Sequence, residues 1–178
     1  MRFQNAVRSK AVKVVCVAAL LATVSACSTS SEVKFSGKTQ AFAHNATFVV
    51  AETKDSTGFV FEDKSEAFKL DDAFTGALKT ALAKESIPTT GAGAYTIKSE
   101  IVAYAPGNAF ARWLMPGAGA TELSTVSKVY AASGEEIATI PVSRSIAAGG
   151  GYTVGAYKYV FTDNAQEVAS LIKARMAQ

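Results

Sequence analysis

The sequence predicts an α+β domain in which a mostly antiparallel sheet of about four strands carries two helices packed on one face. Three observations predict this class. Two stretches repeat apolar residues every three or four positions, as amphipathic helices do. Other stretches alternate apolar and polar residues or are rich in β-branched residues, as strands are. Their order along the chain is strand, helix, three strands and helix, within one domain over residues 46–178.

The chain begins with the features of an export signal. Basic residues are frequent in the first positions, no acidic residue precedes Glu32, and the apolar run Val14–Ala22 follows. This run is about half of the ~20 residues that a membrane-spanning helix needs, so it is typical of a signal peptide that is later removed. Residues 1–26 are therefore predicted to be a signal peptide.

The end of this signal resembles the bacterial lipobox, in which a lipid is attached to a cysteine and the chain is cut before it. The residues are Val24, Ser25, Ala26 and Cys27. The alternative is an ordinary cleavage site after Ala26, with a cysteine following by chance. The Ser/Thr-rich stretch after Cys27 favours the lipobox, because such anchors usually carry an unstructured tether. We expect Cys27 to be acylated and residues 28–45 to form a flexible tether with a typical reach of roughly 25 Å.

The residue after the cysteine indicates the destination of the chain. It is Ser28 rather than aspartate, which resembles the pattern of lipoproteins sorted to the outer membrane of Gram-negative bacteria. In such a host we expect the lipid on Cys27 to hold the domain to the outer membrane, facing the periplasm.

The charge of the chain argues against a nucleic-acid-binding protein, and its cysteine content argues against a disulfide-stabilised domain. Four of the 18 basic residues lie in the predicted signal, so 14 basic residues face 15 acidic ones in the mature chain. No Lys/Arg cluster stands out, and no nucleic-acid partner is expected. Cys16 leaves with the signal and Cys27 is expected to be acylated, so the domain has no disulfide and depends on its core alone.

The first strand and the first helix follow the predicted tether. Thr47–Ala51 is a short β-branched and aromatic run, which favours a strand. The apolar residues of the helix then lie four apart, at Leu70, Phe74, Leu78 and Leu82. Asp71 is predicted to be its N-cap, and Pro88 ends it.

Three strands come next. Tyr95–Tyr104 alternates, with a predicted buried face of Tyr95, Ile97, Ile101 and Ala103. Residues 121–130 and 135–146 flank Ser133-Gly134, which predicts a tight turn and an antiparallel hairpin. Pro141 lacks the backbone N–H that a sheet needs, so we expect it at an edge or a bulge.

The last helix is predicted to start near Asp163, with Gln166 in a capping-box arrangement. Before it, the glycines at 149–151 and 155, together with Tyr152, Tyr157 and Tyr159, predict a loose loop. The predicted buried face of the helix is Ala165, Val168, Ala169, Ile172 and Met176.

The residue inventory does not favour an enzyme. His44 is the single histidine and lies in the predicted tether, so neither a metal site nor a Ser-His-Asp triad is expected. Ser31 and Lys34 match an S-x-x-K spacing, but the companion motifs are missing. No phosphate-binding glycine motif is present, and no cofactor is expected. An enzyme that uses scattered carboxylates would need a buried Asp, Glu or Lys with a displaced pKa.

The connection over residues 105–119 carries the candidate partner-binding residues Arg112, Trp113, Leu114 and Met115. Two interpretations stay open. The large apolar side chains fold back over the open end of the sheet, with a turn at Pro116, because aromatic residues are usually buried. Alternatively, they form an exposed apolar tip that binds a partner protein or the bilayer. Arg112 beside the tip suits a phosphate or a carboxylate.

The stretch from Arg112 to Thr139, RWLMPGAGATELSTVSKVYAASGEEIAT, resembles the centre of a family of bacterial lipoproteins, domain of unknown function 4410. Members share an Arg, an apolar run, a Gly-x-Gly, an alternating strand and a small-residue-Gly turn. Arg112, Gly117, Gly119 and Gly134 stand at those places here. The resemblance covers most of residues 46–176. It implies an envelope lipoprotein and no established activity.

The leading hypothesis is a non-enzymatic, lipid-anchored envelope lipoprotein that binds or organises a periplasmic or membrane partner. The alternative is a small-ligand carrier with a pocket between the helices and the sheet, lined by Phe74, Tyr95 or Tyr157.

Overall fold

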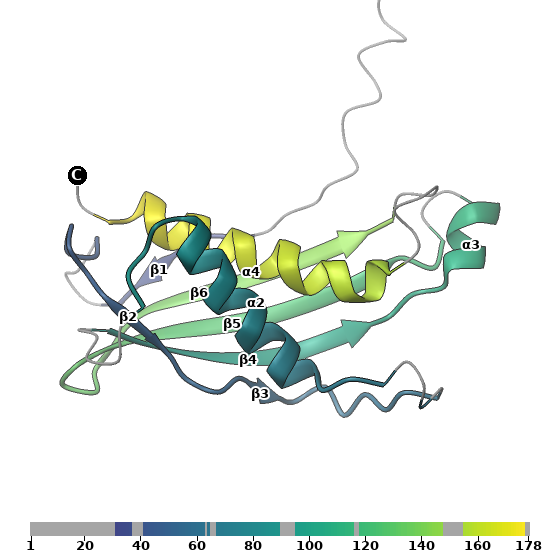
Figure 1. Cartoon of the computed structure of the whole chain (residues 1–178), viewed down its shortest axis with the longest axis horizontal. Coiled ribbons are helices and arrows are strands. Elements are labelled where there is room, and N and C mark those ends of the chain that lie inside the picture. Colours follow the sequence, from purple (N-terminus) through teal and green to yellow (C-terminus); the bar gives the residue numbers. More distant parts are fainter. Residues whose placement is uncertain are drawn as a thin grey trace, which may run out of the picture.

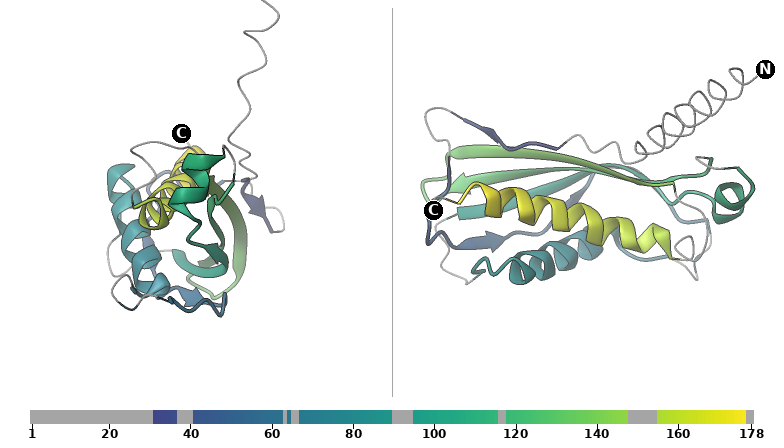
Figure 2. Two further views of the ribbon diagram at one scale, coloured as in Figure 1. Left: turned by 90° about the vertical axis from the view of Figure 1, so that its right-hand side faces the viewer. Right: turned by 90° about the horizontal axis from the view of Figure 1, so that it is seen from above.

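The computed structural model describes residues 31–36, 41–62, 64, 67–89, 95–115, 118–147 and 155–176. Two long helices, α2 (Leu70–Lys84) and α4 (Ala156–Ala174), cover one face of a sheet. A short helix, α3 (Ala109–Leu114), lies at one end of the molecule (Figure 1). The further views show both long helices on the same side of a curved sheet (Figure 2). The predicted α+β class is confirmed.

The sheet is mixed, with the order β1-β6-β5-β4-β2, and β3 also pairs with β4. Its strands are β1 (Lys34–Phe35), β2 (Phe48–Val50), β3 (Lys54–Asp55), β4 (Tyr95–Ala105), β5 (Thr121–Ala131) and β6 (Glu136–Ile146). The three long strands, β4 to β6, form the predicted antiparallel meander. Gly134, with φ +87°, lies in the predicted turn between β5 and β6. The short strands β2 and β3 run parallel to β4 because α2 carries the chain back before β4 begins.

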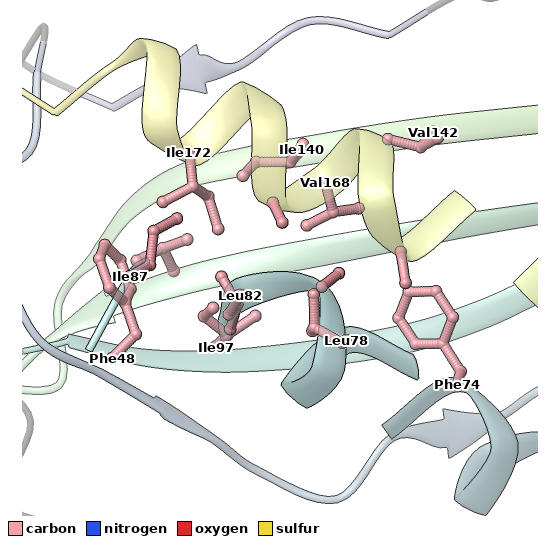
Figure 3. Packing of buried hydrophobic residues seen from close by; sticks show 14 of the residues in the cluster. Phe48, Phe74, Leu78, Leu82, Ile87, Ile97, Ile140, Val142, Val168 and Ile172 are labelled. Carbon is pink, nitrogen blue, oxygen red and sulfur yellow. The ribbon is translucent and has the colours of Figure 1, made fainter. Parts of the chain in front are cut away.

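Helix α2 buries the predicted face. Its four spaced apolar residues are all buried. The side chains of Phe74, Leu78 and Leu82 lie in the packed core beneath α4 (Figure 3). The predicted N-cap is wrong, because the helix begins at Leu70 and Lys69 occupies the cap position. Asp71 and Asp72 instead lie in the first turn, where negative charge is favourable near the positive end of the helix dipole.

A bulge changes which side chains of β4 face the core. Ile101 pairs with Thr125 and Ala103 pairs with Ser124, so Val102 is the extra residue. Beyond it the alternation is inverted: Tyr104 is buried, whereas Ala103 is exposed. The prediction that Ala103 belongs to the buried face is therefore wrong.

Pro141 lies in β6, opposite Val126 of β5. The outer side of β6 is covered only lightly in the described part of the chain, since the two-residue strand β1 pairs with Ala138 and Thr139. The missing N–H of Pro141 is tolerated in such a nearly edge position. The register shift between β5 and β6 lies at Val129/Tyr130 rather than at Pro141.

Helix α4 starts seven residues before the predicted Asp163, with Gly155 as its N-cap at φ +82°. Its buried stripe includes Ala156, Val160 and Asn164, four residues apart, and continues into the predicted face. Tyr157 and Tyr159 lie beside this stripe rather than in a loop. Gln166 does not cap the helix start but donates a hydrogen bond to Glu85, at the end of α2 (2.6 Å).

Part of the predicted tether is packed against the domain. Lys34 and Phe35 form β1 on β6. Phe42 is 1% exposed and contacts the rings of Phe35, Phe48 and Tyr95. The prediction of a free tether over 28–45 is wrong for these residues, because burying Phe42 and partly burying Phe35 outweighs the entropy of a loose chain.

The side chain of Asn164 links α4 to the two central strands. Asn164 is fully buried, and its amide nitrogen donates to the carbonyl oxygens of Leu123 in β5 (3.1 Å) and Val142 in β6 (3.2 Å). Its amide oxygen accepts from the hydroxyl of Thr125 (2.8 Å). Because buried polar groups must find partners, these three bonds favour one position of α4 on the sheet.

We predict that Asn164→Leu lowers the free energy of unfolding by about 2 kcal/mol or more, because two buried carbonyls and one hydroxyl lose a partner. Urea denaturation measures this change. Asp163→Ala, at an exposed site on the same helix, is the control and should change stability by about 0.5 kcal/mol or less. Equal effects of the two substitutions would contradict the role assigned to Asn164.

Candidate functional site

The connection between β4 and β5 contains a helix that the sequence analysis did not predict. Helix α3 begins after Asn108, whose side-chain oxygen accepts a hydrogen bond from the backbone N–H of Ala111 (3.0 Å). This is an ordinary N-cap, with asparagine three residues before the donor. Asn108 is thus the local signal from which the helix could have been predicted.

The base of this connection is closed by hydrogen bonds. The N–H of Asn108 donates to the carbonyl of Gly119 (2.9 Å), and the hydroxyl of Thr121 donates to the carbonyl of Pro106 (2.7 Å). Gly119 has φ +63°, and a Cβ there would lie 2.7 Å from the carbonyl oxygen of Asn108. Only glycine fits this close approach without a shift of backbone. Residues 106–121 therefore form a closed loop that presents α3 from the end of the sheet.

The surface of α3 exposes large apolar side chains. Phe110 is 68% exposed, Leu114 66% and Met115 62%. Phe110 was missed by the sequence analysis, although it stands four residues before Leu114 and thus on the same side of a helix. This exposure favours the interpretation of an apolar tip for Leu114 and Met115.

Arg112 and Trp113 belong to α3, but their side chains lie outside the described part of the structure, as do Pro116 and Gly117. Whether Trp113 folds back over the sheet is therefore untested. Its role in binding a partner, like that of Arg112, Leu114 and Met115, stays a prediction.

Three further exposed apolar residues lie on segments that pack around the end of β4. Val60 (80%), Tyr159 (55%) and Val102 (45%) complete the set of strongly exposed large hydrophobic residues in the described part of the chain. The segments that carry them meet around Tyr104, whose hydroxyl donates to the carbonyl of Tyr157 (3.1 Å) and whose ring lies 5.0 Å from that of Phe59. We call Phe110, Leu114 and Met115 the apolar end.

The opposite end of the sheet has a different character. There the β5–β6 hairpin exposes Ala132, Ser133, Gly134 and Glu135. Figure 1 shows this hairpin and α3 at opposite ends of the long strands. The domain thus has one polar end and one apolar end.

Charged side chains pair on the face of the sheet that the helices leave open. Lys128 lies 2.9 Å from Glu136, and hydrogen bonding to Glu136 raises the pKa of Lys128. Lys128, and after it Thr139, lowers the pKa of Glu136. Hydrogen bonds from Ser56 and Lys54 lower the pKa of Glu100.

These three are the groups with displaced pKa values among the described residues, and all lie near the surface. No three His, Cys, Asp or Glu residues in the described ranges lie close enough together to hold a metal ion. None of the described helices is long and apolar enough to cross a membrane.

The residues predicted to line a ligand pocket contact other side chains. Phe74 is fully buried in the core between α2 and the sheet (Figure 3). Tyr95 stacks on Phe48, with ring centroids 5.4 Å apart. Tyr157 lies beside Phe68 at 6.1 Å. Each of these three side chains is thus in contact with other side chains of the domain.

The family of the chain follows from its sequence. The family model of domain of unknown function 4410 matches residues 41–150, which is more than half of the chain. The chain therefore belongs to this family, as its resemblance indicated. A comparison with curated proteins finds no match.

Among solved structures, the fold is similar to that of PelC from Paraburkholderia phytofirmans. Two crystal structures of PelC, both described as dodecamers, each give a TM-score of 0.54 at 12% sequence identity. The match covers 84% of this chain and 99% of PelC. A Xanthomonas campestris protein assigned to domain of unknown function 330 gives a TM-score of 0.45 at 12% identity, over 72% of this chain and 85% of that protein. At this level of identity, the likeness to PelC shows a shared fold.

We predict that Gly119→Ala destabilises the protein more than Gly134→Ala does. Both glycines have positive φ, but a Cβ at Gly134 meets nothing within 4 Å, whereas one at Gly119 meets the Asn108 carbonyl. The added crowding should cost about 1–3 kcal/mol beyond the conformational cost that the two share. Urea denaturation gives the difference.

The same pair of variants tests whether the closed loop holds α3. Gly119→Ala should also accelerate tryptic cleavage after Arg112, since α3 would lose its fixed base. Gly134→Ala should leave that cleavage rate unchanged. An equal rate in both variants would contradict the closed loop as the support of α3.

Proposed function

We propose that this chain is a non-enzymatic envelope lipoprotein, anchored by a lipid on Cys27, that binds a periplasmic or membrane partner through its apolar end. The observation that carries the proposal is the exposure of Phe110, Leu114 and Met115 on a short helix with a closed base. A soluble domain rarely exposes several large apolar side chains at one end unless that surface has a partner.

The sequence at the start of the chain supports the anchor. An export signal, small residues and Cys27 stand in lipobox order, and the described domain begins only four residues later, at Ser31. Ser28 favours sorting to the outer membrane in a Gram-negative host, with the domain facing the periplasm. Membership in domain of unknown function 4410 is consistent with this placement.

The described charged groups support a binding role rather than catalysis. The groups with displaced pKa values lie near the surface, and pairs such as Lys128 with Glu136 act as ordinary surface ion pairs, which contribute little to stability. The small-ligand carrier has no specific observation in its favour, because Phe74 and Tyr95 are occupied in packing.

We predict that Cys27→Ser moves the protein from the membrane fraction to the soluble periplasmic fraction, because the serine hydroxyl cannot accept the lipid as the thiol does. Cys16→Ser is the matched control: it lies in the predicted signal, so the mature protein is unchanged and stays with the membrane. Cell fractionation with immunoblotting measures both. Membrane retention of a Cys27→Ser protein from which the signal has been removed would overturn the anchor and with it the proposed function.

A further inference from the structure

We propose that the partner of the apolar end is the surface of the same bilayer that holds the lipid on Cys27. The inference rests on the proposed function, since it requires that lipid. It is carried by where the described chain begins, how far Cys27 can lie from that point, and which end of the domain is apolar.

The start of the described chain is fixed to the domain by side chains. The hydroxyl of Ser31 donates to one carboxylate oxygen of Glu167 in α4 (2.6 Å). The other oxygen of Glu167 accepts from Arg144 in β6 (2.5 Å). Both members of this ion pair are about three-quarters buried, at 26% and 23% side-chain exposure. Because both oxygens of this partly buried carboxylate are bonded, Ser31 is held more firmly than it would be by a solvated carboxylate.

The direction of the chain at this point leads toward the apolar end. Phe35 pairs with Ala138, Lys34 with Thr139, and Ser31 with Val142. Followed toward the N-terminus, the chain therefore advances along β6 toward Ile146. Ile146 pairs with Thr121, which closes the base of the loop that carries α3.

The length of the covalent chain decides which end the lipid can reach. Ser31 lies four positions after Cys27, and four residue steps of extended chain span about 14 Å at most. The same number of strand residues leads from Val142 to Ile146, which is also about 14 Å. In the other direction, Glu136 at the hairpin end lies about 20 Å from Val142 along β6. Cys27 can therefore lie level with Ile146 and the base of the α3 loop, but it cannot lie level with Glu136 at the hairpin end.

The chemistry of the apolar end suits an interface between lipid and water. Large apolar side chains such as Phe and Leu on the exposed face of a helix bury favourably in the boundary between headgroups and acyl chains. Phe110, Leu114 and Met115 are each more than 60% exposed, so they can enter this boundary without refolding. Because the lipid on Cys27 already holds the domain at the bilayer, even a weak contact of the tip becomes effectively intramolecular.

The experiment uses the full acylated chain in vesicles of phosphatidylethanolamine and phosphatidylglycerol. Leu114→Cys carries an environment-sensitive fluorophore, and Ala132→Cys, at the exposed hairpin, is the matched control. Each new thiol is the single reactive one, because Cys16 leaves with the signal and Cys27 is acylated. Met115→Cys gives a second position at the tip if labelling at Leu114 disturbs it.

We expect nitroxide-labelled acyl chains to quench the fluorophore at Leu114 by about twofold or more, because the tip lies in the interfacial region. Aqueous iodide should quench the fluorophore at Ala132 and not the one at Leu114. Quenching of Leu114 by iodide, as at Ala132, would overturn the inference. Shielding of Leu114 from both quenchers would also overturn it, since a protein, whether a second copy or another chain, would then cover the tip.

The mass of the N-terminal peptide from the same sample separates this inference from the proposed function. If Cys27 is acylated but nitroxide-labelled acyl chains do not quench the fluorophore at Leu114, the lipid anchor is confirmed and the membrane contact of α3 is contradicted. A Cys27 without lipid overturns both.

Discussion

The buried amide of Asn164 sets the position of α4, and much of the domain depends on that position. Its hydrogen bonds to the carbonyls of Leu123 and Val142 join one helix to two neighbouring strands. Glu167, three residues further on, is thereby placed beside Arg144 and can hold Ser31. At the start of the same helix, Tyr157 is placed against Tyr104. One polar contact in an apolar core thus aligns the entry of the chain with the apolar end, because an unsatisfied amide in any shifted register would be costly.

Because of this alignment, the chain enters the domain pointing toward one particular end of the sheet, the end that carries α3. The three long strands separate a polar hairpin from the loop of α3, and the chain enters along β6 toward that loop. Gly119 and Thr121 close the base of the loop, so the exposed side chains of α3 are presented by a fixed support. A fixed support matters for a weak surface contact, since little entropy is then lost when the contact forms.

Periodic apolar patterns predicted the parts of the fold that bury regular faces. The predictions of the buried stripe of α2 and of the hairpin around Gly134 were correct because local residue spacing alone determines both features. The start of α4 was missed because Asn164 interrupts the apolar stripe, and only the sheet shows that its amide is satisfied. The bulge at Val102 inverts the buried face of β4, and this shift of register is seen only in the pairing of β4 with β5. Within the candidate site, Leu114 and Met115 were identified from their residue types, whereas Phe110 required the helix to be known.

The central claim is that the apolar end, and not the hairpin end, faces the membrane. Amide hydrogen exchange tests it most directly, without labels, by comparing the acylated chain on vesicles with the Cys27→Ser chain in solution. The account predicts slower exchange on vesicles for the backbone amides of residues 108–115, with no change in residues 131–136. Slower exchange in residues 131–136, or no change in residues 108–115, would contradict it.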